Sequence, residues 1–191
     1  ALLIAYEVLT GFGRCGTLFA FKRAGLNPDL IALSKGLTGG FLPMGVTMAR
    51  EKIFSSFIGE EPKLTLWHGH SFTGNPLGCA AANASLDLLE ENPEHYESFQ
   101  SRHLPHLKTI AQHSKVKKIR VTGSIAAFDL NVNSPSGYLN LAGKSIKESA
   151  MERGVFLRPL GNVVYLLPPL CINDAQLEQC YSAIKVGLEA L

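Results

Sequence analysis

Short apolar runs separated by glycine-rich loops fill the first half of the chain. Each run is short enough to be a buried β-strand, and the loops between them carry the glycines that tight turns need. We therefore predict three buried strands, at 1–6, 30–33 and 44–48. Two short helices are expected between and after them, at 18–25 and 50–57.

The pattern changes near Pro93, which ends a helix predicted over 76–90. Beyond it we expect a helix over 94–113, followed by short strands mixed with helices. The strands are predicted at 116–121, 126–130, 155–158 and 163–167, and the helices at 141–153 and 174–188. This order predicts an α/β protein in which 1–92 is part of a larger α/β layer, 93–115 a connecting helix and 116–191 a small α+β domain.

Composition narrows the possible partners. The chain has 191 residues, of which 46% are hydrophobic and only 18% charged, so part of its surface is expected to be apolar or covered by something else. A net charge of +2 argues against a nucleic-acid-binding surface. The one dense basic stretch, from Lys115 to Arg120, is interpreted as a solvated strand or helix end.

The chain shows no sign of a membrane segment or a leader. No apolar run approaches the roughly 20 residues of a membrane helix. There is no signal peptide, and the chain opens at Ala1 inside an apolar run, which indicates a fragment of a cytoplasmic protein. Scattered cysteines without metal-ligand spacing fit free buried thiols. These cysteines are Cys15, Cys79, Cys171 and Cys180.

Two glycine motifs resemble nucleotide-binding signatures and are interpreted otherwise. The G-x-G-x-x-G string from Gly11 to Gly16 does not stand directly between a strand and a helix, so a structural glycine loop is favoured over a dinucleotide site. The string Gly143-Lys144-Ser145 lacks the earlier glycine of a phosphate loop, so Lys144 is expected on a helix surface.

A polar loop precedes the helix predicted at 76–90. His68 and His70 have too few companions for a zinc site, and a polar loop near an anionic ligand fits better. The first amides of a helix suit a phosphate. Ordinary N-capping by Thr73 or Asn75 is an equally good interpretation, and the sequence leaves both open.

Lys35 stands where a buried strand is expected to end, immediately before a glycine-rich loop. Lysines mostly remain exposed, and a desolvated, neutral amine can form a Schiff base with an aldehyde. The flanking glycines would let a planar cofactor lie close. A solvent-facing lysine at the end of a strand is the competing interpretation.

Arg158 ends a predicted strand close to Tyr165 in the sequence. A guanidinium in such a place can hold a carboxylate through two parallel hydrogen bonds. A salt bridge at the strand end explains it equally well.

Taken together, these strings resemble the class III, fold-type I aminotransferases that use pyridoxal 5′-phosphate. The strings that carry the resemblance are VLTGFGR at 8–14, PD at 28–29, LSKG at 33–36, GHSFTGNPLGCAAA at 69–82 and GVFLRPLGNVVYLLPP at 154–169. The resemblance follows the whole chain in order. It corresponds to the C-terminal part of a family polypeptide, somewhat less than half of it, with a partial large-domain sheet and an intact small domain.

The resemblance implies the roles of several residues. Lys35 would be the Schiff-base lysine and proton shuttle, and Ser71 would bind the cofactor phosphate of the neighbouring subunit in a homodimer. Arg158 would hold the substrate carboxylate, with Tyr165 and Gly69 in the substrate pocket. The cofactor site would then lie at the subunit interface.

The strings at 37–43, 67–70, 69–82 and 154–169 are most similar to the branch of the family that serves biotin synthesis. That branch transfers an amino group from S-adenosylmethionine to 8-amino-7-oxononanoate, a small-molecule substrate. Two alternatives stay open. One is a class III transaminase for ornithine, acetylornithine or an ω-amino acid, and the other is a non-catalytic dimerising fragment.

Tyr6 departs from the family pattern, which places Asp there, twenty-nine residues before Lys35. That Asp pairs with the pyridine nitrogen of the cofactor and keeps it protonated, and such electronic tuning is the protein's main contribution. A phenol stays neutral and is bulkier. Glu7 should not substitute, because successive strand residues point to opposite faces. Catalysis by this chain is therefore expected to be impaired.

Overall fold

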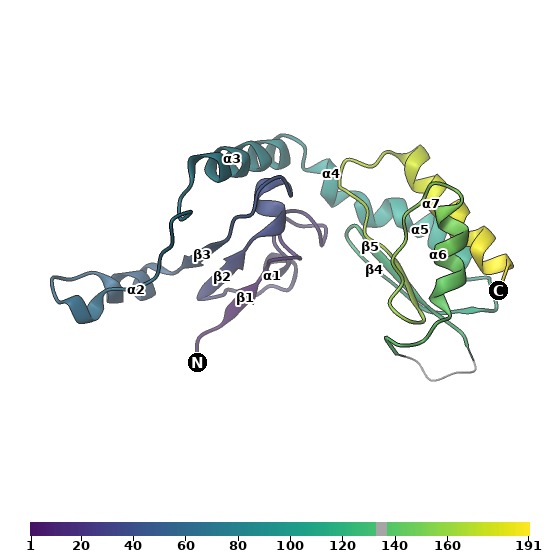
Figure 1. Ribbon diagram of the computed structural model, residues 1–191, viewed down its shortest axis with the longest axis horizontal. Helices are drawn as coiled ribbons and strands as arrows, with labels where there is room; N and C mark the ends of the chain where they lie inside the picture. Colours follow the sequence, from purple (N-terminus) through teal and green to yellow (C-terminus); the bar gives the residue numbers. More distant parts are fainter. Residues whose placement is uncertain (133–136) are drawn as a thin grey trace. The chain divides into compact units, whose positions relative to one another are not determined.

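Two three-stranded sheets, one in each half of the chain, organise the fold (Figure 1). The computed structural model describes residues 1–132 and 137–191. They form two units, Ala1–Pro93 and Glu94–Leu191. The helices over 94–110 belong to the second unit, where α5 packs against β4 and α7.

The first sheet has the order β1-β2-β3. Strand β1 (Ile4–Tyr6) is parallel to β2 (Leu30–Leu33), and β3 (Val46–Ala49) is antiparallel to β2. The three predicted strands are therefore present, although β1 is shorter and β3 begins two residues later than predicted. The prediction that they are buried was wrong for β1 and β3, most of whose residues are exposed. Ala32 pairs with Tyr6 on β1 and with Thr47 on β3.

Short helices connect these strands. A buried carboxylate, that of Glu7, accepts hydrogen bonds from the backbone amides of Ala20 and Phe21 (3.1 and 2.7 Å), and so starts α1 (Ala20–Arg23). The helix predicted at 50–57 is α2 (Glu51–Phe54) continued by the 3₁₀ turn η2 (Ser55–Phe57). Two further 3₁₀ turns are η1 (Lys35–Thr38) and η3 (Pro62–Leu64).

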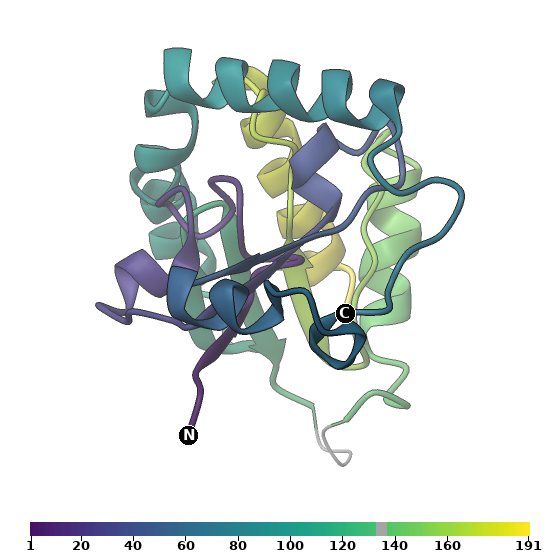
Figure 2. The ribbon, with the colours of Figure 1, turned by 90° about the vertical axis from the view of Figure 1, so that its left-hand side faces the viewer.

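Helix α3 (Pro76–Glu91) is the longest helix of the first unit and runs across the view in Figure 2. It begins where predicted, because the Asn75 side chain accepts a hydrogen bond from the Gly78 amide at 2.7 Å and Pro76 occupies the first turn. Its buried face packs on β2 and η1 in a small core. That core consists of Phe12, Leu33, Leu37 and Ala82.

The second sheet is antiparallel throughout and has the order β4-β5-β6. Its strands are β4 (Val116–Thr122), β5 (Ile125–Leu130) and β6 (Val163–Leu166). Helices α6 (Gly143–Met151) and α7 (Asp174–Glu189) run side by side (Figure 1). Their apolar faces and β5 form a continuous core that includes the fully buried Leu130, Ile146 and Ile184.

Two predicted elements of the second unit were wrong. The helix predicted over 94–113 is two helices, α4 (Glu94–Glu97) and α5 (Phe99–Ile110). They separate at Ser98, whose hydroxyl donates to the Glu94 carbonyl at 2.6 Å, a local bond that competes with regular helix geometry.

The strand predicted at 155–158 is an extended segment outside any sheet. Gly154 turns the chain out of α6 with a φ of 72°. Pro159, which has no amide proton to offer a sheet, follows the segment. Val155 and Leu157 are buried while Phe156 and Arg158 are exposed, so the alternation of apolar positions is real although no strand pairs with it.

A buried histidine ties three elements of the second unit together. His103 of α5 is fully buried, with its Nδ1 2.6 Å from the Tyr181 hydroxyl of α7 and its Nε2 3.2 Å from the Ser124 carbonyl in the β4–β5 turn. A carbonyl only accepts, so Nε2 carries the proton and Tyr181 donates to Nδ1. Burial lowers the pKa of His103 to about 4 and raises that of Tyr181.

Strand β4 is the edge of the second sheet that carries the basic stretch. Its ladder with β5 shifts register between Lys117 and Arg120, and Lys118 has a φ of 51°. Lys118 and Arg120 both approach the carboxylate of Asp129, at 3.9 and 2.7 Å. This is the solvated strand that the sequence predicted.

Among the residues that the structure describes, no helix combines the length and the hydrophobicity that a membrane span requires.

Candidate functional site

Lys35 follows β2 directly and is the first residue of η1. Its side chain is exposed, so the residues of this chain do not supply the desolvation that the sequence led us to expect. Its backbone is left-handed, with a φ of 45°, a conformation that non-glycine residues seldom adopt. The end of the strand and the turn that follows it therefore present the amine away from the core.

Fixed backbone surrounds Lys35 on both sides. The Ser34 hydroxyl donates to the Met44 carbonyl at 2.7 Å, and the Ser85 hydroxyl of α3 donates to the Gly36 carbonyl at 3.0 Å. The buried Thr38 hydroxyl donates to the Leu42 carbonyl at 2.6 Å and so closes the glycine loop after η1. The backbone around Lys35 is therefore held by bonds to two separate segments, 42–44 and α3.

The glycine loop at 11–16 packs against the same turn. A Cβ on Gly36 would lie 2.9 Å from the Cβ of Phe12, so only glycine fits there without a shift. Phe12 itself is buried and has a φ of 58°. The loop is thus structural, as the sequence analysis expected, and it lies beside the candidate cofactor lysine.

Tyr6 lies on β1 opposite Ala32 of the neighbouring strand β2. Ala32 is three residues before Lys35, which follows the end of that strand. Its side chain is 74% exposed, whereas that of Glu7 is 2% exposed on the opposite face. Glu7 also receives a hydrogen bond from the Thr10 hydroxyl at 2.6 Å, in addition to those from α1. Glu7 is therefore fully used in the fold and does not replace the missing carboxylate at Tyr6.

Gly69 and Ser71 lie in the exposed loop before α3. His70 and Thr73 close a turn there, with the Thr73 amide donating to the His70 carbonyl at 2.9 Å and the His70 amide to the Thr73 hydroxyl at 3.0 Å. Asn75 caps the helix, so the capping interpretation holds for its first turn. Ser71 stands on the outside of this turn.

Arg158 and Tyr165 belong to the second unit. Arg158 is exposed in the extended segment after α6, and Tyr165 is half-buried in β6 opposite Ala127. A tight turn with Gly161 at a φ of 62° joins the two segments, and the backbones of Leu160 and Val163 bond to each other across it. The meeting of these two side chains with Lys35 stays a prediction.

The string at 143–145 and the cysteines show no sign of a binding site. Lys144 lies on the surface of α6 with its amine 3.8 Å from Glu148, so it is not part of a phosphate loop. Cys15 is buried, but Cys171 is exposed, which corrects the expectation that all four thiols are buried. In the part of the chain that the structure describes, no group of three or more metal-binding side chains forms.

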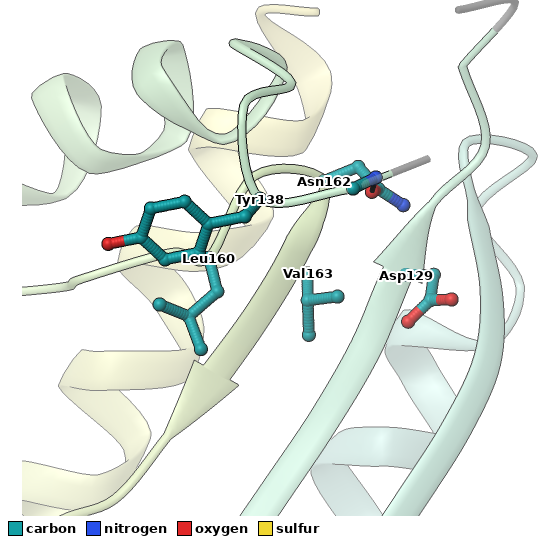
Figure 3. Close-up of a pocket in the computed structure, with 6 residues that line it drawn as sticks. Asp129, Tyr138, Leu160, Asn162 and Val163 are labelled. Atoms are coloured by element: carbon teal, nitrogen blue, oxygen red, sulfur yellow. Dashed lines mark hydrogen bonds between the residues drawn. The ribbon is translucent and has the colours of Figure 1, made fainter. Parts of the chain in front are cut away.

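A cavity of about 360 Å³ opens in the second unit (Figure 3). Its lining residues are Asp129, Gly137, Tyr138, Leu160, Asn162 and Val163. The side-chain Oδ1 of Asn162 accepts from the Gly137 amide at 3.0 Å, and its buried Nδ2 has no partner among the described residues. The lining includes neither Arg158 nor Tyr165, so this cavity is separate from the candidate substrate residues.

Comparison with known proteins decides the family. The model of the class-III aminotransferase family matches residues 1–188. The chain belongs to this family. Its α/β architecture and its resemblance to the family, both predicted from the sequence, are therefore confirmed.

Curated relatives cover the whole chain. It is 54% identical over 191 residues to the adenosylmethionine-8-amino-7-oxononanoate aminotransferase of Synechococcus elongatus, and 41% identical over 201 residues to that of Geobacter sulfurreducens. These matches cover 100% of this chain and 45% and 44% of the relatives. The chain thus spans less than half the length of these relatives.

Solved structures agree with the sequence relatives. An aminotransferase of Bacillus anthracis superposes with a TM-score of 0.90 at 29% identity, over 100% of this chain and 45% of its own. The adenosylmethionine-8-amino-7-oxononanoate aminotransferase of Methanocaldococcus jannaschii gives 0.82 at 34% identity, over 94% and 44%. A PLP-bound amine transaminase from an uncultivated Pseudomonas species gives 0.88 at 30% identity, over 99% and 44%.

Sequence reasoning missed Ser85 and His103. Ser85 lies three residues after the buried Ala82 and four residues before Leu89. It is therefore on the face of α3 that packs inward. A polar side chain on an apolar helix face needs a partner, and this was the available signal. The signal for His103 was the same, since it follows the buried Phe99 at a spacing of four along α5.

Proposed function

We propose that this chain is the cofactor-lysine part of an enzyme that transfers an amino group from S-adenosylmethionine to 8-amino-7-oxononanoate. The observation that carries the proposal is the match to the Synechococcus enzyme along all 191 residues, with Lys35 presented at the end of β2. The cofactor is pyridoxal 5′-phosphate, the group present in the PLP-bound Pseudomonas transaminase.

The surroundings of Lys35 suit covalent attachment of this cofactor. Among the described residues no hydrogen bond or ion pair occupies the Lys35 amine, which is exposed. A Cβ built on Gly40 meets no atom within 4 Å, so the glycine loop leaves open space. These features fit a flat aldehyde bound to Lys35.

Tyr6 does not suit the place beside the ring nitrogen of the cofactor. A protonated ring nitrogen needs an anionic partner, and the phenol offers none. Glu7, the adjacent carboxylate, is buried on the opposite face. The expected consequence is a lysine that captures the cofactor normally but a cofactor that is poorly activated.

The family resemblance gives the part that we assign to each residue in the reaction. Bound pyridoxal phosphate supplies an electron sink for the substrate carbon. The Nζ of Lys35 would hold the cofactor and would then move a proton between the substrate Cα and C4′ of the cofactor. Arg158 would bind the substrate carboxylate through paired hydrogen bonds, and Tyr165 and Gly69 would also contact the substrate.

We assign Ser71 to the cofactor phosphate of a second copy of the chain. Ser71 lies in an exposed turn next to Trp67 and Phe72, which are 82% and 76% exposed. Large apolar side chains exposed in one place mark an interface. A homodimer would cover them and bring Ser71 to the partner's cofactor. A cytoplasmic location remains a prediction.

A chimera tests this proposal directly. The chain replaces the matching 191 residues of the Synechococcus enzyme, an alignment whose length equals that of the chain. With S-adenosylmethionine as donor, we expect weak formation of the diamine product. We expect Tyr6→Asp to raise the rate about 10²-fold, the scale of one electrostatic contact to a developing charge.

Two further variants make the outcome decisive. Lys35→Ala should lower the rate by roughly 10²–10⁴-fold, because it removes the proton carrier. Lys52→Ala, a change at an exposed lysine of α2, is the matched control and should leave it unchanged. Equal rates with Tyr6 and Asp would refute the role of Tyr6. Activity with glutamate instead of S-adenosylmethionine would support another class III transaminase, and no activity even with Tyr6→Asp would support a non-catalytic fragment.

A further inference from the structure

The backbone of Lys35 is held in an unfavourable conformation. Three non-glycine residues among those described have a positive φ, namely Phe12, Lys35 and Lys118. Two of them, Phe12 and Lys35, meet at one place, because the Phe12 ring packs on Gly36. Strained backbone persists only where neighbouring structure over-determines it, and it tends to occur at functional sites.

The contact that Ser85 makes is the long-range one in this arrangement. Its hydroxyl on α3 donates to the Gly36 carbonyl, 49 residues away in the sequence and one residue after Lys35. The Ser34 bond to Met44 spans only ten residues and lies before Lys35. Ser85 therefore holds the carbonyl of the peptide unit that joins Gly36 to Leu37, the second unit after the strained residue.

Phe12 limits the same peptide unit from another direction. Its Cβ and Cδ2 would lie 2.9 and 3.0 Å from a Cβ on Gly36, so the ring leaves no space for this segment to shift toward it. The hydroxyl of Ser85 and the ring of Phe12 thus both restrain Gly36, the residue that directly follows the left-handed Lys35.

We propose that Ser85 is a positioning residue for Lys35. It holds the Gly36 carbonyl, keeps Lys35 left-handed and thereby aims its amine at the cofactor aldehyde. This inference rests on the proposed function for its purpose, but the conformational effect of Ser85 exists without any cofactor.

The first arm of the test uses the cofactor-free 191-residue chain. Backbone chemical shifts of Lys35 report its left-handed conformation, and amide exchange of Leu37, whose amide bonds to the Ser34 carbonyl at 3.0 Å, reports the turn. Ser85→Ala should move the Lys35 shifts and speed Leu37 exchange about tenfold. Ser85→Thr, which keeps the hydroxyl, should restore both.

A matched control separates this effect from the loss of any helix serine. Ser101 of α5 also donates to a backbone carbonyl, that of Ser98 at 2.6 Å. Ser101→Ala should leave Lys35 and Leu37 unchanged. Unchanged shifts and exchange in Ser85→Ala would overturn the proposal, whether or not the chain binds pyridoxal phosphate.

The second arm measures how readily the Lys35 amine reacts with pyridoxal phosphate. Pyridoxal phosphate is added across a pH series, trapped by borohydride and quantified at Lys35 relative to the exposed Lys52 by mass spectrometry. Ser85→Ala should lower the Lys35 to Lys52 ratio at least fivefold and change its pH profile, with rescue by Ser85→Thr. Trapping at Lys35 that Ser85→Ala does not change would overturn the positioning role.

The two arms fail in distinguishable ways. If the wild-type chain traps no more cofactor at Lys35 than at Lys52, the proposed cofactor site is contradicted. The conformational arm then still decides whether Ser85 holds the backbone of Lys35. A general loss of helical circular dichroism in Ser85→Ala, without rescue by Ser85→Thr, would assign Ser85 a folding role instead and overturn the proposal.

Discussion

The two units of this chain differ in how much apolar surface they bury. Residues 94–191 bury a continuous core between β5, α6 and α7, and the buried His103 is hydrogen-bonded through both ring nitrogens. Residues 1–93 carry Lys35 and Ser71, yet their core is small. They also expose large apolar side chains, among them Leu2, Ile4, Tyr6, Phe41, Phe54, Trp67, Phe72 and Leu77.

The difference indicates what each unit can do by itself. Burial of apolar surface is the main favourable contribution to folding, so the second unit has the means to be stable alone. The first unit leaves apolar surface of a kind that normally meets a partner or promotes aggregation. The proposed cofactor lysine, Lys35, therefore lies in the unit that leaves more large apolar side chains exposed.

The two sheet edges show the same contrast. Strand β4 bears a register shift, a left-handed Lys118 and other charged residues, which are common protections against unwanted pairing. Strand β1 has no second neighbour among the described strands, and its Ile4 and Tyr6 are 61% and 74% exposed. The β4 edge is therefore protected, and the β1 edge is open.

The largest expected effect is on the core of the second unit. Ile146 is fully buried, and Gly187 of α7 packs directly on it. Ile146→Ala should lower the free energy of unfolding of this unit by about 2–5 kcal/mol. Urea titration followed by circular dichroism measures the loss. Leu139→Ala, at an 89% exposed side chain, is the control and should change little. Equal losses of stability in Ile146→Ala and Leu139→Ala would contradict the conclusion that the buried core stabilises the second unit.

Acid should destabilise the second unit through His103. Its pKa is about 4 in the folded chain against 6.5 for a free histidine, so the unfolded chain binds more protons between these values. Stability should therefore fall as the pH drops from about 6.5 to 4, by about 3 kcal/mol in total. Urea titrations at several pH values measure this slope.

The faces around His103 carry other groups that require a control. His106 of α5 stacks on Tyr181, and its Nδ1 lies 3.3 Å from Glu178, while Arg102 pairs with Asp174. His103→Gln should flatten the slope, whereas His95→Gln, at an exposed histidine, should keep it. A slope that survives His103→Gln would contradict the role of His103.

Helix caps allow the same change in both units. Asn75 caps α3, and Asn173 caps α7 in a reciprocal pair with Gln176 at 2.9 and 3.1 Å. Each Asn→Ala change should cost about 1 kcal/mol. We expect hydrogen exchange to speed up across α3 in the first case and across α7 in the second. Spread of either effect into the other unit would show that the two units unfold together.

The smallest effect on stability should come from the open edge. Ile4→Lys places a charge on β1, which should change the free energy of unfolding by less than about 0.5 kcal/mol. It should nevertheless reduce self-association, measured by sedimentation velocity. Leu139→Lys adds the same charge away from the edge and is the control. If both variants reduce association equally, net charge and not the edge is responsible.

Local patterns in the sequence were enough to predict most of the fold. The strands near 4–6, 30–33 and 163–166 and the helices that begin at Pro76 and Asp174 all carry clear periodicity or an asparagine cap. Such signals lie within a few residues of the element that they define. For the same reason, the opposite faces of Tyr6 and Glu7 followed from the strand alternation alone.

The sequence failed where an outcome depended on distant partners. The alternation at 155–158 resembles a strand, but no neighbouring strand pairs with it. Ser98 interrupts a helix that the periodicity of 94–113 supports. Pairing and competing hydrogen bonds decide such cases, and neither is written in the local pattern.

The sequence by itself determined the family, and it predicted Lys35 as the cofactor lysine and Tyr6 as a departure from the family pattern, because these depend on which residues stand at which positions. Only the tertiary structure showed that Lys35 is exposed and left-handed, and that Ser85 and Phe12 both contact Gly36, the residue after it. The reason is physical: a backbone conformation that neighbouring atoms enforce depends on contacts between segments far apart in the chain.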